Sequence, residues 1–514
     1  MSARSPRGGA HPSAPSSVAS AAGGFPGAAA PPTGAARTFE DIARAVGRAA
    51  PPTGRPVVCV QGLGFVGAAM AVAVASAQDA EGQPRYDVIG VDLPTDAGRA
   101  RIEALNAGRF PFASRDEQLA GELVRAHERA NLIATSDAAV FALASVVVVD
   151  IPLDVDWDTD PPALRWDGFR RGITTLARMM SPGSLAILES TVPPGTTARV
   201  VAPIFEQELK ARGLPPGAVN LAHSYERVMP GRDYLESIVN FWRVYAGHTP
   251  AAAEACERFL RDVIHVDRHP LARLRSTTAS ELGKVLENAY RATTIAFMEE
   301  WSRFAEGTGV DLFEVVDAIR VRPTHSNMRT PGFGVGGYCL TKDPLFAALG
   351  ARDLFGREAA FPFSALAVQT NRLMPLASLE RLQDLLGGSL EGRSILLLGV
   401  SYRQDVGDTR HSPAEIFVRA ARDRGARVIA HDPLVRRWEE LDLDLPAELP
   451  KAAGVDAVVL AVPHREYREL DYEAWLGDHK PVLLDAFSVL SREQRDRLRA
   501  RGCRVESVGR GPGL

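Results

Sequence analysis

The chain has 514 residues, 46% of them hydrophobic and 24% charged, a composition typical of a globular protein that is too long for a single core. At about 150 residues per domain, it has room for three domains and an additional segment. The formal net charge of -4 argues against nucleic acid as the main partner, and the apolar runs stay below the roughly 18 residues of a membrane span.

The first segment, residues 1–53, is dominated by Ala, Pro, Gly and Ser. Such a segment buries too little apolar surface to offset its chain entropy, so we expect a disordered tail without a secretion signal. The cysteines are spread along the chain without metal-type spacing: Cys59, Cys256, Cys339 and Cys503. Neither disulfides nor a metal site are therefore expected, and the cytoplasm is the expected compartment.

A strand, a glycine turn and a helix open the ordered chain. Val57–Gln61 leads into Gly62-Leu63-Gly64-Phe65-Val66-Gly67 and a small apolar helix, and a second strand, Asp87–Val91, ends at Asp92. This is the dinucleotide fingerprint, in which the glycines allow a tight turn, approach of the pyrophosphate and close helix packing. Asp92 would accept the ribose hydroxyls and repel a 2′-phosphate, which favours NAD over NADP.

The same alternating pattern continues with strands expected at 145–149, 185–188 and 219–222. Each strand end carries polar residues, among them Asp150, Thr191 and Glu226. Ligands of doubly wound sheets bind at the carboxyl ends of the strands, so we place Thr191 and Glu226 nearest the chemistry. Taken singly, each residue favours a structural role, Thr191 as a helix cap and Glu226 as a surface charge.

A long helix is expected from Ala279 to Glu300, and Glu281, Lys284, Asn288 and Arg291 recur on one of its faces. A polar stripe is usually solvated. However, Lys284 and Asn288 are one turn apart, the spacing that lets an ammonium and an amide donate to one developing oxyanion. A later helix, 364–386, could pack subunits together.

The loop Pro331-Gly332-Phe333-Gly334-Val335-Gly336-Gly337-Tyr338-Cys339 precedes Lys342, Asp343 and an apolar helix start. Its glycines predict a backbone that approaches a ligand closely. A thiol near a helix start and a lysine is expected to have a lowered pKa, which makes Cys339 a candidate nucleophile. The alternative is a glycine turn with a buried structural cysteine.

A second α/β unit opens after Gly392, with strands expected at 394–399, 427–430, 457–462 and 481–484. Its first turn has only Gly399 and is rich in side-chain donors, including Arg403 and Arg410. This pattern predicts a Rossmann-like lobe that holds a different phosphorylated ligand through arginines.

The order of these motifs resembles the UDP-glucose/GDP-mannose dehydrogenase family, which oxidises the C6 alcohol of a nucleotide sugar to a carboxylate with two NAD. The matching motifs are Gly62–Gly67, Glu189-Ser190-Thr191-Val192-Pro193-Pro194-Gly195, Glu226-Arg227-Val228-Met229-Pro230-Gly231, Glu281–Asn288, the loop with Cys339 and Asp343, and Asp408-Thr409-Arg410-His411-Ser412-Pro413. The resemblance implies an NAD-binding Rossmann domain (54–267), a central helical domain (268–388) and a C-terminal UDP-sugar-binding Rossmann-like domain (389–514).

The resemblance also implies roles. Asp343 and Thr191 would hold a water near C6, Cys339 would trap the aldehyde, Lys284 and Asn288 would stabilise oxyanions, and Glu226 would assist hydrolysis of a thioester. Catalytic candidates are Cys339, Lys284, Asn288, Asp343, Glu226 and Thr191; cofactor candidates are Gly62, Gly64, Phe65, Val66, Gly67, Asp92, Thr191 and Lys342; substrate candidates are Glu226, Arg227, Lys284, Asn288, Phe333, Gly334, Gly336, Gly337, Arg403 and Arg410.

The chain departs from the family pattern at several positions. Tyr225 stands in place of the usual proline, Tyr338 of histidine, Arg403 of lysine and His411 of glutamate. The Glu-Arg-Val-Met-Pro-Gly motif resembles the branch acting on UDP-N-acetylhexosamines, because Pro230 stands where the UDP-glucose branch has a second glutamate. We therefore favour an N-acetylated sugar over glucose, with GDP-mannose third.

Other classes remain open from the sequence. A 3-hydroxyacid dehydrogenase pairs a Rossmann domain with lysine- and asparagine-bearing helices, but it performs one oxidation and needs neither Cys339 nor a third domain. A catalytically silent sugar-nucleotide-binding protein is the other alternative. We expect a homodimer or a higher homo-oligomer, with no nucleic acid or membrane partner.

Overall fold

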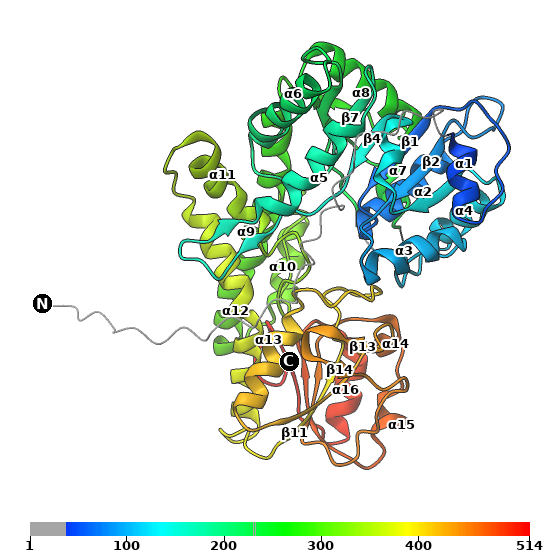
Figure 1. Cartoon of the computed structure of the whole chain (residues 1–514). Helices are drawn as coiled ribbons and strands as arrows, with labels where there is room; N and C mark the ends of the chain where they lie inside the picture. Colours follow the sequence, from blue (N-terminus) through cyan, green and yellow to red (C-terminus); the bar gives the residue numbers. More distant parts are fainter. Residues whose placement is uncertain (1–37, 230, 232) are drawn as a thin grey trace, which may run out of the picture.

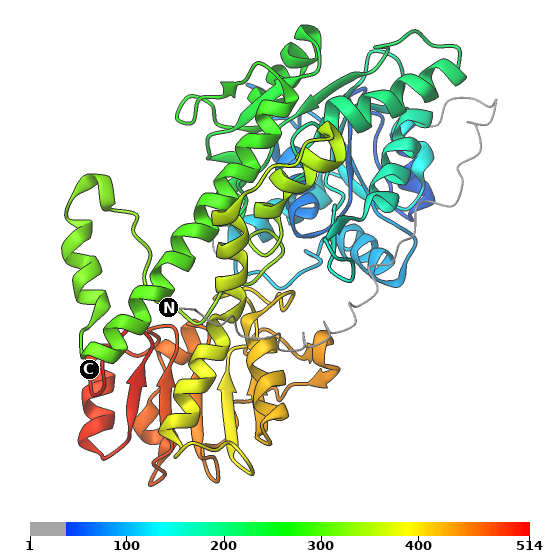
Figure 2. The same ribbon diagram turned by 90° about the vertical axis from the view of Figure 1, so that its left-hand side faces the viewer.

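A computed structural model describes residues 38–229, 231 and 233–514. An N-terminal α/β lobe and a C-terminal α/β lobe are joined by the long helices α9 (Thr277–Thr308) and α12 (Pro362–Leu385), which run side by side (Figures 1 and 2). This architecture confirms the predicted fold class. Within the described ranges, no helix combines the length and apolar character needed to cross a bilayer.

The N-terminal sheet has the strand order β10-β9-β8-β7-β4-β1-β2-β3. β9 runs antiparallel to β8, and the other neighbouring strands are parallel. The strands are β1 (Val57–Gln61), β2 (Asp87–Val91), β3 (Leu132–Thr135), β4 (Ala144–Val149), β7 (Leu185–Leu188), β8 (Asn220–His223), β9 (Val244–Gly247) and β10 (Ala272–Arg273). The direction of winding reverses between β1 and β4, which is the switch point where such sheets bind ligands.

Helices cover both faces of this sheet, because strands buried on both sides present apolar residues to each. One core lies under α5 and α6, and the other under α2, α4 and α8. The helices of the lobe are α2 (Phe65–Ser76), α3 (Asp96–Asn106), α4 (Glu117–Glu128), α5 (Trp166–Met179), α6 (Ala202–Ala211), α7 (Glu236–Val239) and α8 (Pro250–Val263), and β5 (Val155–Asp156) pairs with β6 (Ala163–Leu164) outside the sheet.

A further helix, α1 (Phe39–Ala45), lies in the segment predicted to be a disordered tail. Thr38 and Asp41 form a capping box at its start, and Phe39, Ile42 and Ala43 pack into the core under α5. The prediction of a disordered tail over residues 1–53 is therefore wrong for α1. Residues 1–37 of the predicted tail lie outside the described residues.

Between the lobes, α9 begins at Ser276, whose hydroxyl accepts from the backbone of Ala279, and ends at Gly309 in the left-handed conformation. α10 (Leu312–Arg320) follows as a projecting arm (Figure 2), and α11 (Phe346–Phe355) follows the glycine loop. The three-residue turn Asp343–Leu345 separates that loop from α11. The glycine loop therefore lies between α10 and the turn that leads into α11.

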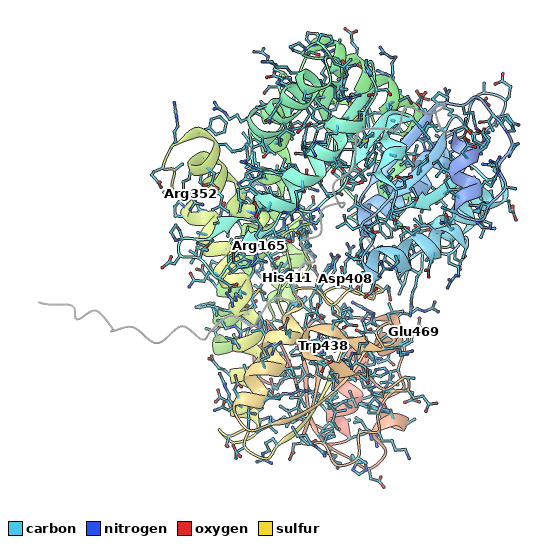
Figure 3. All side chains as sticks on the ribbon, in the orientation of Figure 1. Arg165, Arg352, Asp408, His411, Trp438 and Glu469 are labelled. Atoms are coloured by element: carbon cyan, nitrogen blue, oxygen red, sulfur yellow. The ribbon has the colours of Figure 1, made fainter. Side chains whose placement is uncertain are left out.

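The C-terminal sheet is parallel, with the order β12-β11-β15-β16-β17. Its main elements are β11 (Ser394–Leu398), α13 (Pro413–Asp423), β12 (Arg427–His431), β15 (Ala457–Leu460), α14 (Arg465–Arg468), α15 (Tyr472–Leu476), β16 (Val482–Asp485), α16 (Arg492–Ala500) and β17 (Val505–Ser507), with the small hairpin β13 (Arg437–Trp438) and β14 (Leu443–Asp444). The segment after β11, which carries Asp408 and His411, faces the N-terminal lobe (Figure 3).

Candidate active site

The glycine turn after β1 has the geometry of a dinucleotide cradle. Gly62 has φ +94°, and a Cβ there would stand 2.6 Å from the carbonyl oxygen of Asp150. A Cβ on Gly67 would stand 1.9 Å from the carbonyl oxygen of Gly62. Gly64, in contrast, caps α2 without a side-chain hydrogen bond, and nothing lies within 4 Å of its would-be Cβ. A backbone open to a helix N-terminus fits a pyrophosphate group.

Asp92 follows β2 and is buried beside this cradle. One carboxylate oxygen accepts from the amide of Leu93, and the other pairs with Arg101 at 3.0 Å. Phe65, the first residue of α2, stacks on Phe112 with ring centroids 3.9 Å apart. The acid predicted to bind the ribose is thus in place, and it shares its charge with an arginine that the sequence analysis did not identify.

Three of the four residues in the polar stripe of α9 are buried and Arg291 is half-buried, so the interpretation as a solvated face is wrong. Lys284 donates to the backbone oxygen of Glu226 at 2.8 Å and pairs with its carboxylate at 3.1 Å. Asn288 donates to Asp343 at 2.8 Å. Lys342 pairs with the other oxygen of Asp343, also at 2.8 Å. The alternative of Glu226 as a surface charge also fails, because this residue is buried.

The charge of Lys284 is fixed by its partner. Burial has the largest single effect and lowers the pKa of Lys284, but Glu226, Cys339 and Asp343 together outweigh burial, and the net pKa is raised. Lys284 therefore stays an ammonium at neutral pH and keeps its capacity to stabilise an oxyanion.

Cys339 is exposed in the turn before Asp343, so the alternative of a buried structural cysteine does not hold. The expected lowering of the thiol pKa is also wrong. Although the residue is open to solvent, the protein atoms packed around its thiol and the Asp343 carboxylate raise the pKa to about 11, and Lys284 opposes them. The backbone oxygen of Cys339 accepts from Asp343 at 2.9 Å, so the sulfur precedes a turn rather than the amide end of a long helix. In the free protein the nucleophile is a neutral thiol.

The glycines of the loop permit contact with protein. A Cβ on Gly336 would stand 2.7 Å from Tyr402, and one on Gly337, whose φ is +81°, would stand 2.8 Å from the Tyr402 ring. A Cβ on Gly334 would stand 2.8 Å from Pro413, and Phe333 is buried against Phe417. These close approaches are to the C-terminal domain, whereas the sequence suggested approach to a ligand. The role of these four loop residues in sugar-nucleotide binding stays a prediction.

The residue before the nucleophile ties the loop to both lobes. The Tyr338 hydroxyl donates to Asp154, which follows β4, and its ring lies 6.3 Å from that of His411. The ammonium of Lys342 lies 4.3 Å from the centre of the Tyr338 ring. The positions that depart from the family pattern, Tyr338 and His411, are thus neighbours at the site.

The arginines expected to bind the nucleotide occupy different places. Arg403 is exposed on the segment after β11. Arg410 makes a bidentate pair with Asp408, and its guanidinium carbon lies 4.8 Å from the ring centre of Phe65 at the start of α2. Arg410 therefore also adjoins the cofactor cradle.

The remaining predicted side chains lie around this centre. Thr191 is half-buried at the carboxyl end of β7, and Arg227 pairs with Glu287 at 3.2 Å. Glu281 accepts from the amides of Gly195 and Thr197 at 2.6 and 2.7 Å, so it anchors the turn that follows Thr191. The regular spacing along α9 indicated Glu281, but nothing in the sequence indicated its partners.

A dinucleotide cradle that faces a cysteine, a charged lysine and buried carboxylates is typical of a cofactor-dependent dehydrogenase. The chain belongs to the UDP-glucose/GDP-mannose dehydrogenase family: the NAD binding domain of this family matches residues 57–264, the central domain matches 278–372 and the UDP binding domain matches 396–492. It is therefore an NAD-dependent nucleotide-sugar dehydrogenase, which confirms the predicted family and cofactor. The match to all three domains of this family excludes the alternative of a 3-hydroxyacid dehydrogenase.

The chain is similar along most of its length to characterised members. It is 30% identical over 441 residues to a UDP-N-acetyl-D-mannosamine dehydrogenase of Pyrococcus horikoshii, covering 81% of this chain and 91% of that protein. It is 29% identical over 429 residues to an NDP-N-acetyl-D-galactosaminuronic acid dehydrogenase of Ralstonia nicotianae, covering 80% and 92%. The solved structure of the UDP-D-ManNAc dehydrogenase from Pyrococcus horikoshii has a TM-score of 0.72 at 27% identity, covering 88% of this chain and 99% of that one.

Proposed function

We propose that this chain oxidises the C6 alcohol of a UDP-N-acetylhexosamine to the carboxylate in two successive steps, each with one NAD. The observation that carries the proposal is the convergence of Lys284, Asn288 and Asp343 beside the turn of Cys339. Similarity to relatives named for N-acetylated sugars supports the substrate class. The glycine turn after β1 and Asp92 fit NAD, which would accept the hydride in each oxidation.

The first oxidation needs an acceptor for the hydroxyl proton. Asp343 is held by Asn288 and Lys342, which supports its role as the group that takes that proton through a water, with Thr191 as the second residue that would hold the water. Lys284 and Asn288 stabilise the negative charge that develops on the C6 oxygen. The aldehyde is formed when C6 loses its hydride and the oxygen loses its proton.

The second oxidation needs a nucleophile, because an aldehyde must first add one before it can donate hydride. The Cys339 sulfur adds to C6 and its proton passes to the oxygen, which gives a thiohemiacetal. Loss of a second hydride from C6 and of the hydroxyl proton gives a thioester, and water cleaves its C–S bond to return the thiol and release the carboxylate and a proton. In this proposal Glu226, which is paired with Lys284, assists that water.

The test is product analysis of Cys339→Ser, with Cys503→Ser as a matched control in the C-terminal domain. The parent and Cys503→Ser should form two NADH and one uronate per UDP-N-acetylhexosamine, and Cys339→Ser should form no uronate. Normal uronate yield from Cys339→Ser would end the covalent proposal. No turnover by the parent with UDP-N-acetylglucosamine, UDP-N-acetylmannosamine, UDP-glucose or GDP-mannose would favour the silent binding protein.

We also propose that the chain is a homodimer formed through α9. Six large apolar side chains line one face of this helix and are each 46–63% exposed: Leu282, Leu286, Tyr290, Phe297, Trp301 and Phe304. A contiguous apolar stripe of this length is typical of an interface, and a second copy presents the same surface. The free cysteines support the cytoplasm as the compartment.

A further inference from the structure

Two carboxyl groups lie at the carboxyl ends of neighbouring strands in the N-terminal sheet. Asp150 follows β4 and Glu189 follows β7, and these strands pair in parallel. Glu189 is 2% exposed and pairs with the equally buried Arg243 at 2.5 Å. The proposed reaction steps use neither carboxyl group.

Asp150 and Glu189 contact each other through groups that, when ionised, can only accept hydrogen bonds. Asp150 and Glu189 are in hydrogen-bonding contact. Asp150 Oδ2 and Glu189 Oε2 are both buried, and neither accepts a hydrogen bond from a donor in the part of the chain that the structure describes. Asp150 as a whole is half-buried, but two carboxylates in contact through oxygens withdrawn from water repel strongly, whereas one proton between them satisfies both oxygens. The geometry therefore indicates that one of the two groups is a neutral carboxylic acid and the other a carboxylate.

This pair adjoins the cofactor cradle. The carbonyl oxygen of Asp150 limits the space at Gly62, and its Cβ lies 3.1 Å from the place that a Cβ on Gly67 would take. Dinucleotides bind across the switch point with one half on each half of the sheet. Asp92 marks the adenosine half over β1 and β2, so the pair at β4 and β7 lies under the nicotinamide half.

The charged and titratable groups around Asp150 and Glu189 favour one shared proton over two carboxylates. Burial raises the pKa of Asp150 well above its usual range, and Glu189 and Glu226 raise it further, whereas Arg243 opposes them. Burial also raises the pKa of Glu189. On the neighbouring elements, Glu226 is paired with Lys284 of α9. Burial raises the pKa of Cys256 on α8 and lowers that of His223 on β8 to about 3, so both are uncharged.

We propose that Asp150 and Glu189 share one proton in the free protein and release it when the positively charged oxidised nicotinamide binds beside them. Transfer of hydride removes that positive charge, so the pair regains a proton during each oxidation. Each oxidation therefore causes no net release of a proton, because the hydroxyl loses one and the pair gains one. The pair releases its proton to solvent when oxidised cofactor replaces reduced cofactor. The inference rests on NAD binding alone.

The test is calorimetric titration of the protein with NAD and with NADH, without sugar nucleotide, in phosphate and in Tris buffer near pH 7. The buffers differ in ionisation enthalpy, so the difference in heat counts protons. NAD should release up to one proton more per chain than NADH. Asp150→Asn should lose this difference because an amide still donates to Glu189 but has no proton to release. Asp96→Asn, fully exposed on α3, should keep it.

An equal proton count for NAD and NADH in the parent, or an unchanged difference in Asp150→Asn, would overturn the proposal. If Asp150→Asn does not fold, the parent's affinities against pH decide. The ratio of the NADH to the NAD dissociation constant should rise with pH, by up to tenfold per pH unit, and a ratio independent of pH overturns the proposal. Because no sugar nucleotide is present, failure here leaves the proposed substrate untouched.

Discussion

At the scale of single residues, the protonation of Cys339 determines when the nucleophile is available. Its pKa is raised to about 11, so at pH 7 only about one thiol in ten thousand is ionised. We predict that alkylation of Cys339 by iodoacetamide, without cofactor, rises about tenfold per pH unit from pH 7 to 10 and levels off near pH 11. Mass spectrometry of the Cys339 peptide measures this rate, and full reactivity at pH 7 would contradict the prediction.

The sequence specified the residue types at the site, but not all of their states. Lys284 and Asn288 could be assigned to one face of a helix because their spacing is local. The raised pKa of Cys339 could not be predicted, because it depends on the protein atoms that surround the thiol and on the approach of Asp343 within the folded turn. The bond from Tyr338 to Asp154 joins residues 184 positions apart, which no local pattern indicates.

At the scale of elements, Glu281 couples α9 to the turn after β7. Burial raises its pKa to about 7, although hydrogen bonds from Thr197 and Gly195 lower it. An acid whose pKa is raised on folding stabilises the protein below its ordinary pKa near 4.5, and this contribution is lost as pH rises toward 7. We predict that the stability of the parent relative to Glu281→Gln falls by about 3 kcal/mol between pH 4.5 and 7.5.

Thermal unfolding of the two proteins across this pH range measures that difference. Glu300→Gln, an exposed position on the same helix, provides the control and should show no such trend. A melting-temperature difference between the parent and Glu281→Gln that does not change with pH would show that the carboxyl group stays ionised throughout.

The buried strands were the elements best predicted from sequence. β1 and β2 agree with their predicted bounds because both are short β-branched runs, and β1 is also bounded by Pro56 and Gly62. α1 was missed because a helix of seven residues in a segment rich in Ala and Pro has almost no periodic signal, and its capping box is visible only at Thr38 and Asp41. The glycine loop was recognised, but its packing against Tyr402 depends on how the domains meet.

At the scale of the whole molecule, the lobes meet over the cofactor cradle. Arg115 of the N-terminal lobe pairs with Asp405 at 3.6 Å and also with Glu466. Arg410 reaches Phe65 from the other side. Since the same C-terminal segment packs against the glycine loop, one set of contacts joins the cofactor cradle, the turn of Cys339 and the C-terminal domain.

The opposite faces of α9 relate this centre to assembly. Lys284 and Asn288 are buried in the site, whereas Leu286 and Phe297 lie on the exposed stripe, 63% and 50% accessible. If two copies bury the stripe, charges placed on it must be desolvated without partners, which opposes association. We predict that Leu286→Glu combined with Phe297→Glu converts a dimer into a monomer, as measured by sedimentation velocity.

The matched control is Val124→Glu, which places the same charge on an exposed apolar position of α4, outside the stripe. It should leave the dimer intact. Because α9 also carries Lys284 and Asn288, loosening the stripe should reduce uronate formation, with NAD affinity little changed, since the cradle lies on α2. A parent that sediments as a monomer, or a double variant that remains dimeric, would mean that copies of this chain do not associate through α9.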